Sequence, residues 1–281
     1  MTIHDQFYTN TDIAEQCLKK LKQTVDINVF DYHMEPSAGT GAFYKLLDPD
    51  NRIGIDIDPK CEGVEKMDFL TYNPPDKQKR YLLVGNPPFG KNSSLAIQFF
   101  NQGAEFCDTI AFIVPRIFKR VSVQNKLSMD FILTYSEDLP VKPCCFTPRM
   151  DAKCCFQIWT RTNEPRKKVV YDKTHPDFSF VKHGPKDDKG QPTPPTLADF
   201  ALKAYGSNCG GIVDTNLETL RPKSWHWIKA NIDVNELKKR LESLNYSMTK
   251  DTVRQDSLGQ QELIYLYKQV FGVSMNPSHR V

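Results

Sequence analysis

Along the first part of the chain, segments with the hydrophobic pattern of a helix alternate with segments that have the pattern of a strand. Helical spacing of apolar residues predicts helices over residues 10–22, 43–47 and 94–105. Short strands are predicted over residues 29–33 and 51–56, and apolar runs predict buried strands over 81–85 and 109–114. Strands that alternate with helices are typical of a doubly wound, mostly parallel α/β sheet. We expect residues 135–146 and 153–161 to add an antiparallel hairpin at its edge, across a turn at 147–151.

The pattern changes after residue 170. Residues 184–195 read GPKDDKGQPTPP, a stretch rich in Gly and Pro that predicts a loop. Beyond it, the spacing predicts a glycine turn at 206–211 and helices over 197–205, 234–244 and 258–271. We therefore predict three parts: a first domain over 1–170, a linker over 171–195, and a smaller α+β segment over 196–281.

Composition narrows the class of protein. The 281 residues are 40% hydrophobic and 25% charged, which is enough apolar material for a sizeable core and argues against wholesale disorder. No apolar run approaches the roughly 20 residues of a membrane helix, and residues 1–7 lack the apolar stretch of a secretory signal. We expect an intracellular chain that has no membrane partner. The formal net charge of +3 is too near neutral to indicate a polyanionic partner.

The eight cysteines are expected to be reduced thiols. Two doublets occur, at residues 144–145 and 154–155. Neighbouring residues of a strand point to opposite faces, whereas metal sites usually space their sulfur ligands as C-x₂-C. The doublets are therefore interpreted as small apolar residues packed on paired strands, and no metal site is predicted.

A glycine-rich segment follows the first predicted strand. It reads EPSAGTGAF over residues 35–43, and its glycines allow the backbone to approach a ligand closely. A dinucleotide fingerprint would need a third glycine at position 44, where Tyr44 stands, so NAD is disfavoured. Asp56 and Asp68 come near the ends of the next two strands, and such acids accept hydrogen bonds from ribose hydroxyls or an adenine amino group. A glycine-rich turn and two acids, which follow three successive strands in this order, predict a cofactor that contains a nucleoside.

The most specific motif is GNPPFG over residues 85–90, directly after a buried strand. Two prolines stiffen this loop, so that the Asn86 side-chain oxygen and the Pro87 carbonyl are held as a pair of acceptors. Such a pair suits a planar amino group that is conjugated to a ring or a carbonyl. Phe89 offers a flat face on which the same group can stack. The structural alternative is a rigid turn that carries a core aromatic residue.

Taken in order, EPSAGTGAF, GIDID, DF and GNPPF resemble the motifs of S-adenosylmethionine-dependent amino-methyltransferases, above all the N6-adenine nucleic-acid methyltransferases of gamma motif order. FYT at residues 7–9 resembles their amino-terminal cofactor motif, although Asn10 stands where the family usually has proline. IAFIVP at residues 110–115 resembles the strand after their catalytic loop. The resemblance covers about residues 6–161 and implies the class I, Rossmann-like fold.

The resemblance also implies roles for single positions. Thr9 and Glu35 would bind the methionine end of S-adenosylmethionine, Asp56 the ribose and Asp68 the adenine amino group. The full set of implied cofactor contacts is Tyr8, Thr9, Glu35, Pro36, Ser37, Gly39, Gly41, Asp56, Ile57, Asp68, Phe69 and Asn86. The implied catalytic loop is Asn86, Pro87, Pro88 and Phe89. Phe89 would stack on an extruded base, and Phe146 is a candidate for its other face.

Charge distribution adds a candidate contact to nucleic acid. Residues 116–126 carry four cations and no acid, directly after a predicted strand. Arg116, Lys119 and Arg120 are predicted to contact phosphates, and the alternative is a solvated loop. In the smaller segment, Trp225 and Trp227 either stack on nucleic acid or pack in a core.

We expect an enzyme that methylates the N6 amino group of adenine in nucleic acid, with DNA favoured over RNA. One alternative is a protein glutamine N5-methyltransferase, since a glutamine amide presents a similar conjugated amino group. Another is a non-catalytic nucleic-acid-binding partner subunit that keeps the methyltransferase fold.

Overall fold

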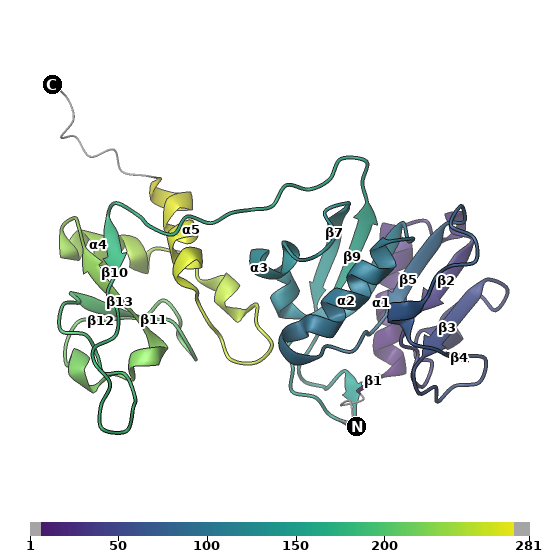
Figure 1. The fold of residues 1–281 in the computed structure, drawn as a ribbon, viewed down its shortest axis with the longest axis horizontal. Coiled ribbons are helices and arrows are strands. Elements are labelled where there is room, and N and C mark those ends of the chain that lie inside the picture. Colours follow the sequence, from purple (N-terminus) through teal and green to yellow (C-terminus); the bar gives the residue numbers. More distant parts are fainter. Residues whose placement is uncertain (1–6, 273–281) are drawn as a thin grey trace. The chain divides into compact units, whose positions relative to one another are not determined.

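The computed structural model describes residues 7–272, which form two compact units (Figure 1). The first unit ends at Val169 and the second begins at Val170. Each unit has a sheet and a hydrophobic core of its own.

The first unit is built on a seven-stranded sheet in the order β4-β3-β2-β5-β6-β9-β7. Its strands are β2 (Tyr32–Glu35), β3 (Arg52–Asp56), β4 (Glu65–Lys66), β5 (Tyr81–Gly85), β6 (Thr109–Pro115), β7 (Phe131–Asp138) and β9 (Cys154–Arg161). Neighbours from β4 to β6 pair in parallel, whereas β9 is antiparallel to both β6 and β7. The expected α/β fold, a mostly parallel sheet with an antiparallel edge, is confirmed.

Helices cover both faces of this sheet. The α-helices of the unit are α1 (Thr11–Thr24), α2 (Ser94–Ala104) and the short α3 (Val121–Gln124). Figure 1 shows α1 and α2 on opposite faces of the sheet. Every residue of β5 and β6 is buried, as expected for strands covered on both sides. From α2, Phe99 and Phe100 enter the core that contains Leu83 and Phe112 of the sheet.

Two expectations for the first unit need correction. The predicted helix over 43–47 is only a 3-10 helix at Tyr44–Leu46, which follows the glycine turns. The predicted hairpin is also different, because its first strand is β7 and ends at Asp138. Residues 146–147 instead form β8 (Phe146–Thr147), which pairs with β1 (Tyr8–Thr9) in a sheet of two strands. A partner distant in sequence thus determines the structure of residues 146–147.

The second unit has a four-stranded antiparallel sheet in the order β10-β13-β11-β12. Its strands are β10 (Phe178–Phe180), β11 (Phe200–Lys203), β12 (Ile212–Val213) and β13 (Trp225–Ala230), and its α-helices are α4 (Val234–Glu242) and α5 (Gln260–Phe271). Core residues of the sheet, such as Phe200 and Ile228, belong to one cluster with Leu237 of α4 and Leu263 of α5.

Two further expectations fail here. The segment 171–195 is not simply a linker, because it contributes β10 to the sheet of the second unit. The helix expected over 197–205 is replaced by β11, in which Phe200 and Leu202 join the core while the intervening Ala201 points to the other face. Pairing with β12 and β13 on both sides outweighs the local helical spacing.

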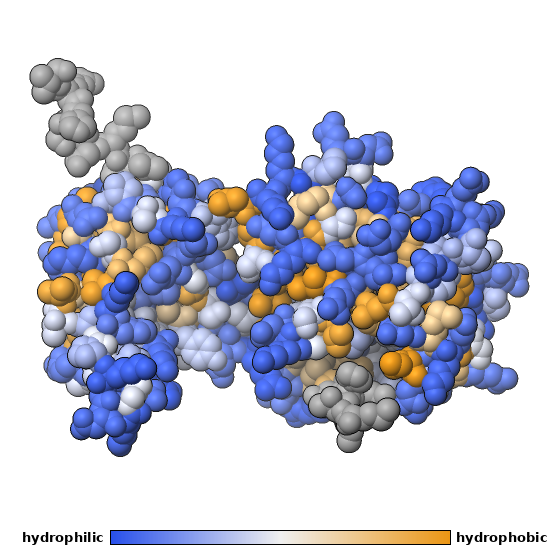
Figure 2. All heavy atoms as spheres, in the orientation of Figure 1, coloured by the Kyte–Doolittle hydropathy of each residue, from blue (hydrophilic) through white to orange (hydrophobic). Residues whose placement is uncertain are grey.

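Short 3-10 helices connect many of these elements, at Ile27–Val29, Tyr44–Leu46, Phe69–Thr71, Lys91–Ser93, Arg116–Lys119, Leu217–Thr219, Pro222–Ser224 and Ser247–Lys250. On the face drawn in Figure 2, polar residues surround small hydrophobic patches in both units. Within residues 7–272, no helix combines the length and the apolar character that crossing a membrane requires. All eight cysteines are free thiols.

Candidate active site

The GNPPFG loop begins at the carboxyl end of β5, where Asn86 follows the last strand residue. The side-chain Nδ2 of Asn86 donates to the main-chain carbonyl of Phe7 at 3.2 Å. A carbonyl can only accept, so this bond fixes the orientation of the amide and leaves Oδ1 on the other side. Oδ1 is buried and has no hydrogen-bond partner among the described residues. A buried acceptor of this kind is costly unless a ligand supplies a donor.

The same loop packs closely on the glycine-rich segment. The Ser37 hydroxyl donates to the main-chain carbonyl of Asn86 at 3.1 Å. A side chain at Gly85 would place its Cβ 3.2 Å from Cγ of Glu35 and 3.6 Å from Cδ of Pro36. Glycine at position 85 therefore permits the two loops to approach, and it brings the segments predicted for catalysis and for cofactor binding together.

Gly39 and Gly41 adopt the left-handed conformation, with φ of +51° and +80°. A Cβ at Gly39 would lie 2.8 Å from the Tyr8 ring, and one at Gly41 would lie 2.6 Å from Sγ of Cys61. Both space and backbone conformation therefore require glycine. The N–H of Gly39 donates to Oδ2 of Asp56 at 2.7 Å, which joins the glycine loop to the end of β3.

The carboxylate of Asp56 has two main-chain partners. Oδ2 accepts from Gly39, and Oδ1 accepts from the N–H of Asp58 at 2.7 Å. Each carboxylate oxygen has a further lone pair, so both can still accept a bond from a ligand hydroxyl. Ile57, directly after Asp56, is 59% exposed. The end of β3 therefore offers an acid beside an exposed apolar side chain.

The Glu35 carboxyl group is buried and forms a hydrogen bond within the protein. It is only 2% exposed, and its Oε2 accepts from the N–H of Tyr44 at 2.6 Å. Burial raises the pKa of this carboxyl well above its usual range, although the hydrogen bonds from the Tyr44 and Phe43 amides act in the opposite direction. The carboxyl group thereby stabilises the start of the 3-10 helix at Tyr44–Leu46.

Asp68 and Phe69 lie just beyond β4, and they differ sharply in exposure. Asp68 is exposed, and its Oδ1 accepts from the N–H of Leu70 at 3.0 Å. The Phe69 ring is 1% exposed and packs with Tyr72 and Phe99 in the core. Only the backbone of Phe69 is therefore a candidate ligand contact, whereas the Asp68 carboxylate is accessible.

Phe89 connects the catalytic loop to α2. Its ring is half-buried, and its carbonyl accepts from the N–H groups of Leu95 and Ala96 at 3.2 and 3.4 Å. These donors belong to the first turn of α2, which has no partner for them within the helix. The loop that carries Phe89 is thus fixed to a helix that packs in the core.

Two other predicted residues meet across the small β1–β8 sheet. Thr9 pairs with Phe146 in the register of these strands, and both are buried, at 7% and 4% exposure. The Thr9 hydroxyl has no hydrogen-bond partner among the described residues. The sequence indicated each residue separately, but two-residue strands have no periodicity that would reveal the pairing.

The basic run does not form the free cationic face that was expected. Arg116 donates to the carbonyls of Cys154 and Leu139 and lies 3.4 Å from Asp138. Lys119 also forms an ion pair with Asp138. Arg120 is 9% exposed. Asp138 and backbone carbonyls therefore engage Arg116, Asp138 engages Lys119, and Arg120 is buried, whereas contact of these cations with phosphates stays a prediction.

The aromatic pair in the second unit is divided between core and surface. Trp227 is 1% exposed and donates to the carbonyl of Pro222, which agrees with core packing, one of the two alternatives that the sequence left open. Trp225 is half-buried, with the Lys203 ammonium 4.5 Å from its ring.

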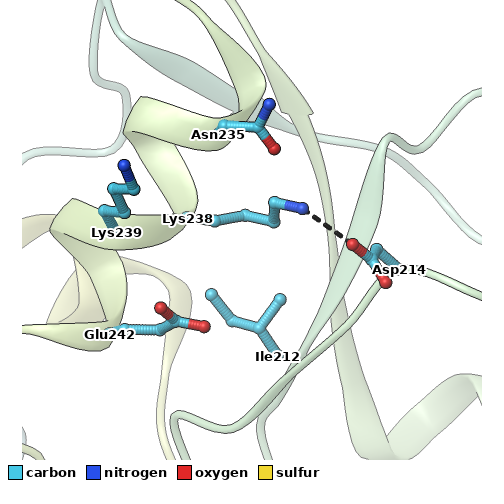
Figure 3. Close-up of a pocket in the computed structure, with 6 residues that line it drawn as sticks. All are labelled: Ile212, Asp214, Asn235, Lys238, Lys239 and Glu242. Atoms are coloured by element: carbon cyan, nitrogen blue, oxygen red, sulfur yellow. Dashed lines mark hydrogen bonds and ion pairs between the residues drawn. The ribbon is translucent and has the colours of Figure 1, made fainter.

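A pocket of about 490 Å³ also lies in the second unit (Figure 3). Its lining consists of Ile212, Asp214, Asn235, Lys238, Lys239 and Glu242. Lys238 and Asp214 form an ion pair of 2.7 Å across it. None of the predicted site residues lines this pocket.

No family model and no curated protein matches this chain. Among solved structures, it is similar to a proposed RNA methyltransferase from Pyrococcus horikoshii, with 16% identity over 57% of this chain and 88% of the other and a TM-score of 0.41. It is also similar to the 23S rRNA methyltransferase ErmE, with 16% identity, 58% and 73% coverage and a TM-score of 0.41. The N-methyltransferase NodS from Bradyrhizobium japonicum gives 12% identity, 55% and 98% coverage and a TM-score of 0.39.

Proposed function

We propose that the chain is an S-adenosylmethionine-dependent methyltransferase that modifies the N6 amino group of adenine in nucleic acid, with DNA favoured over RNA. One observation carries the proposal. The side-chain oxygen of Asn86 is buried without a hydrogen-bond partner within residues 7–272, on a stiff loop that is hydrogen-bonded to the glycine-rich segment. An acceptor held in this way suits an incoming amino group.

The residues at the strand ends fit the cofactor that the motifs imply. Asp56 would accept from the ribose hydroxyls and Asp68 from the adenine amino group. The Thr9 hydroxyl, for which the described residues offer no hydrogen-bond partner, would contact the methionine end. Gly39 and Gly41 supply a loop without side chains. S-adenosylmethionine supplies a methyl group on a positively charged sulfur, which leaves as a neutral thioether.

The catalytic loop would act by orientation. Oδ1 of Asn86 and the carbonyl of Pro87 accept the two N–H bonds of the target amine, which draws its nitrogen toward tetrahedral geometry and frees its lone pair. An asparagine amide is not a base at neutral pH, so the surplus proton passes to water after transfer. Because no covalent enzyme intermediate is needed, alignment and fixed acceptors supply most of the acceleration.

Phe89 favours a nucleobase as the acceptor. An aromatic ring next to the acceptor pair gives a base a surface to stack on, which is worth about 1–3 kcal/mol. A base within a duplex would first have to leave the stack, at a cost of a few kcal/mol. A glutamine side-chain amide could donate to the same acceptors but would gain less from the ring, so protein methylation is the second candidate.

The decisive test is transfer of a labelled methyl group from S-adenosylmethionine to matched acceptors. DNA and RNA, each single- and double-stranded, and a glutamine-containing peptide should be compared, and modified nucleic acid digested to identify the product nucleoside. We expect N6-methyladenosine or its deoxy form, with label highest on DNA. Label on the peptide alone would establish the second candidate, and an inert chain that still binds nucleic acid would indicate a non-catalytic partner.

A further inference from the structure

Asn10, between β1 and α1, forms three hydrogen bonds to one distant segment. Its main-chain N–H donates to the carbonyl of Cys145 at 3.0 Å, and its Nδ2 donates to the carbonyl of Cys144 at 3.0 Å. Its Oδ1 accepts from the hydroxyl of Thr147 at 2.8 Å. A single residue therefore satisfies three groups of the segment 144–147 that surrounds Phe146.

The side chain of Asn10 does not cap the helix that follows it. Asn10 is the N-cap residue of α1, where an asparagine side chain typically accepts from the first turn of the helix. Here the side chain makes no capping bond, and only the main-chain carbonyl receives the N–H groups of Ile13 and Ala14. The amide is directed entirely toward the segment 144–147.

Asn10 directly follows a segment that is anchored to the candidate site. The residues before it are held to the candidate site, because the Phe7 carbonyl binds Asn86 and the Tyr8 ring packs against Gly39. The segment 144–147 instead lies in the irregular connection between β7 and β9, interrupted only by the two residues of β8. The bonds from Asn10 therefore tie the segment that contains Phe146 to this anchored part of the chain.

We propose that Asn10 is a positioning residue that holds Phe146 in place on the acceptor side of the active site. The inference rests on the proposed function and on the candidate role that the motif resemblance gives Phe146, on the other face of an extruded base. The motif resemblance has proline at this position, and proline offers neither the N–H nor the amide. The three bonds from Asn10, which add to the pairing of β1 with β8, are thus a feature of this chain's own asparagine.

Asn10→Pro is a clean test, because Asn10 has φ of −67° and proline fits this value. The variant keeps the main-chain carbonyl that caps α1 and removes all three bonds to the segment 144–147. We expect kcat/KM for the nucleic-acid acceptor to fall about tenfold or more, while the Kd for S-adenosylmethionine stays within about twofold. Hydrogen exchange should accelerate in peptides that cover residues 144–148 and not in those that cover 32–41.

Thr147 provides the matched pair of controls. Thr147→Val removes the hydroxyl that donates to Asn10, whereas Thr147→Ser keeps it. We expect the valine variant to reproduce part of the loss in acceptor kcat/KM and the serine variant to resemble the wild type. This pair also tests the inference if Asn10→Pro fails to fold.

The outcomes separate the two proposals. An active wild type, together with Asn10→Pro and Thr147→Val enzymes whose acceptor kcat/KM is unchanged, would overturn the role of Asn10 and leave the proposed function intact. Cofactor affinity that falls in step with acceptor kcat/KM would indicate general destabilisation and overturn the role as well. A wild type that methylates no nucleic acid would overturn the proposed function, and the inference with it.

Discussion

The side-chain nitrogen of Asn86 donates to the main-chain carbonyl of Phe7, and this bond orients an amide just after β5 from a residue 79 positions earlier in the chain, directly before β1. The bond leaves the opposite oxygen buried, and no group in the described part of the chain forms a hydrogen bond with it. The residue that precedes β1 is therefore part of the candidate site, because its carbonyl determines which atom of the Asn86 amide would face the amine in the proposed reaction.

Asn86→Ala should abolish most of the turnover. Removal of one positioned polar group from a preorganised site typically costs about 10²–10³ in kcat, and the variant removes the acceptor oxygen. The Kd for S-adenosylmethionine should change little, because the Ser37 hydroxyl bonds to the main chain of residue 86 and that bond remains. Single-turnover label transfer and calorimetry measure the two effects. Unchanged turnover would contradict the assigned role.

Asp56→Ala should weaken the cofactor first. The carboxylate holds the N–H groups of Gly39 and Asp58, so its removal loosens the glycine loop as well as deleting the proposed ribose contact. Hydrogen bonds to charged groups support an increase in Kd of about tenfold to a hundredfold, measured by calorimetry. Asp58→Ala is the control, because that side chain pairs with Lys60 at the surface. Equal effects of both substitutions would speak against a specific role for Asp56.

Gly39→Ala should damage the site by steric overlap. Gly39 and Gly190 both have positive φ, at +51° and +71°, so alanine strains the backbone at either position. Only at Gly39 would the new Cβ meet the Tyr8 ring, at 2.8 Å, whereas nothing lies within 4 Å of a Cβ at Gly190. Cofactor affinity should fall for Gly39→Ala and stay near wild type for Gly190→Ala. Similar affinities in the two variants would argue that the glycine loop does not shape the site.

Phe89→Ala should affect the acceptor rather than the cofactor. Loss of one stacking surface, worth about 1–3 kcal/mol, corresponds to a rise of about 5- to 150-fold in the KM for nucleic acid. The main-chain carbonyl that caps α2 remains in the variant. Phe89→Tyr retains a flat ring and should stay close to wild type. Steady-state kinetics with varied acceptor distinguish the two, and an alanine variant with normal KM would exclude stacking on Phe89.

Glu35→Gln should flatten the dependence of stability on pH. Burial raises the pKa of Glu35 in the folded state above its ordinary 4.5, so the folded protein binds more protons than the unfolded chain between the two values. Wild-type stability therefore falls as pH rises through this window, and glutamine removes that contribution. Thermal unfolding at pH 5 and pH 8 should show a smaller fall in Tm for the variant. An equal fall in both proteins would mean that Glu35 folds with a nearly normal pKa.

Several features of the fold and site were predictable because their signals are local. The run over residues 81–85 is uninterrupted and apolar, and the structure places it as the buried strand β5. The motifs around Gly39, Asp56 and Asn86 each follow a strand, and parallel strands bring such ends to one edge of a sheet. The contacts of Asp56 with Gly39 and of Ser37 with Asn86 follow from that geometry.

Other features depended on partners that no local pattern reveals. The segment around Phe200 has helical spacing, yet strands on both sides draw it into the sheet of the second unit. The basic run at Arg116 and Lys119 has no acid within it, but Asp138 on β7 approaches both cations. The contact of Thr9 with Phe146 joins two strands of two residues each, which are too short for any periodicity.

The carbonyl of Phe89, which receives the first amides of α2, has a mechanical consequence. The helix cannot tilt or slide without pulling on the diproline loop, and Phe99 and Phe100 fasten the helix to the interior. Trimming Phe100, a side chain deep below the surface, should therefore alter methyl transfer even though it would touch neither reactant. The packing of aromatic side chains in the core therefore helps to hold the catalytic loop rigid.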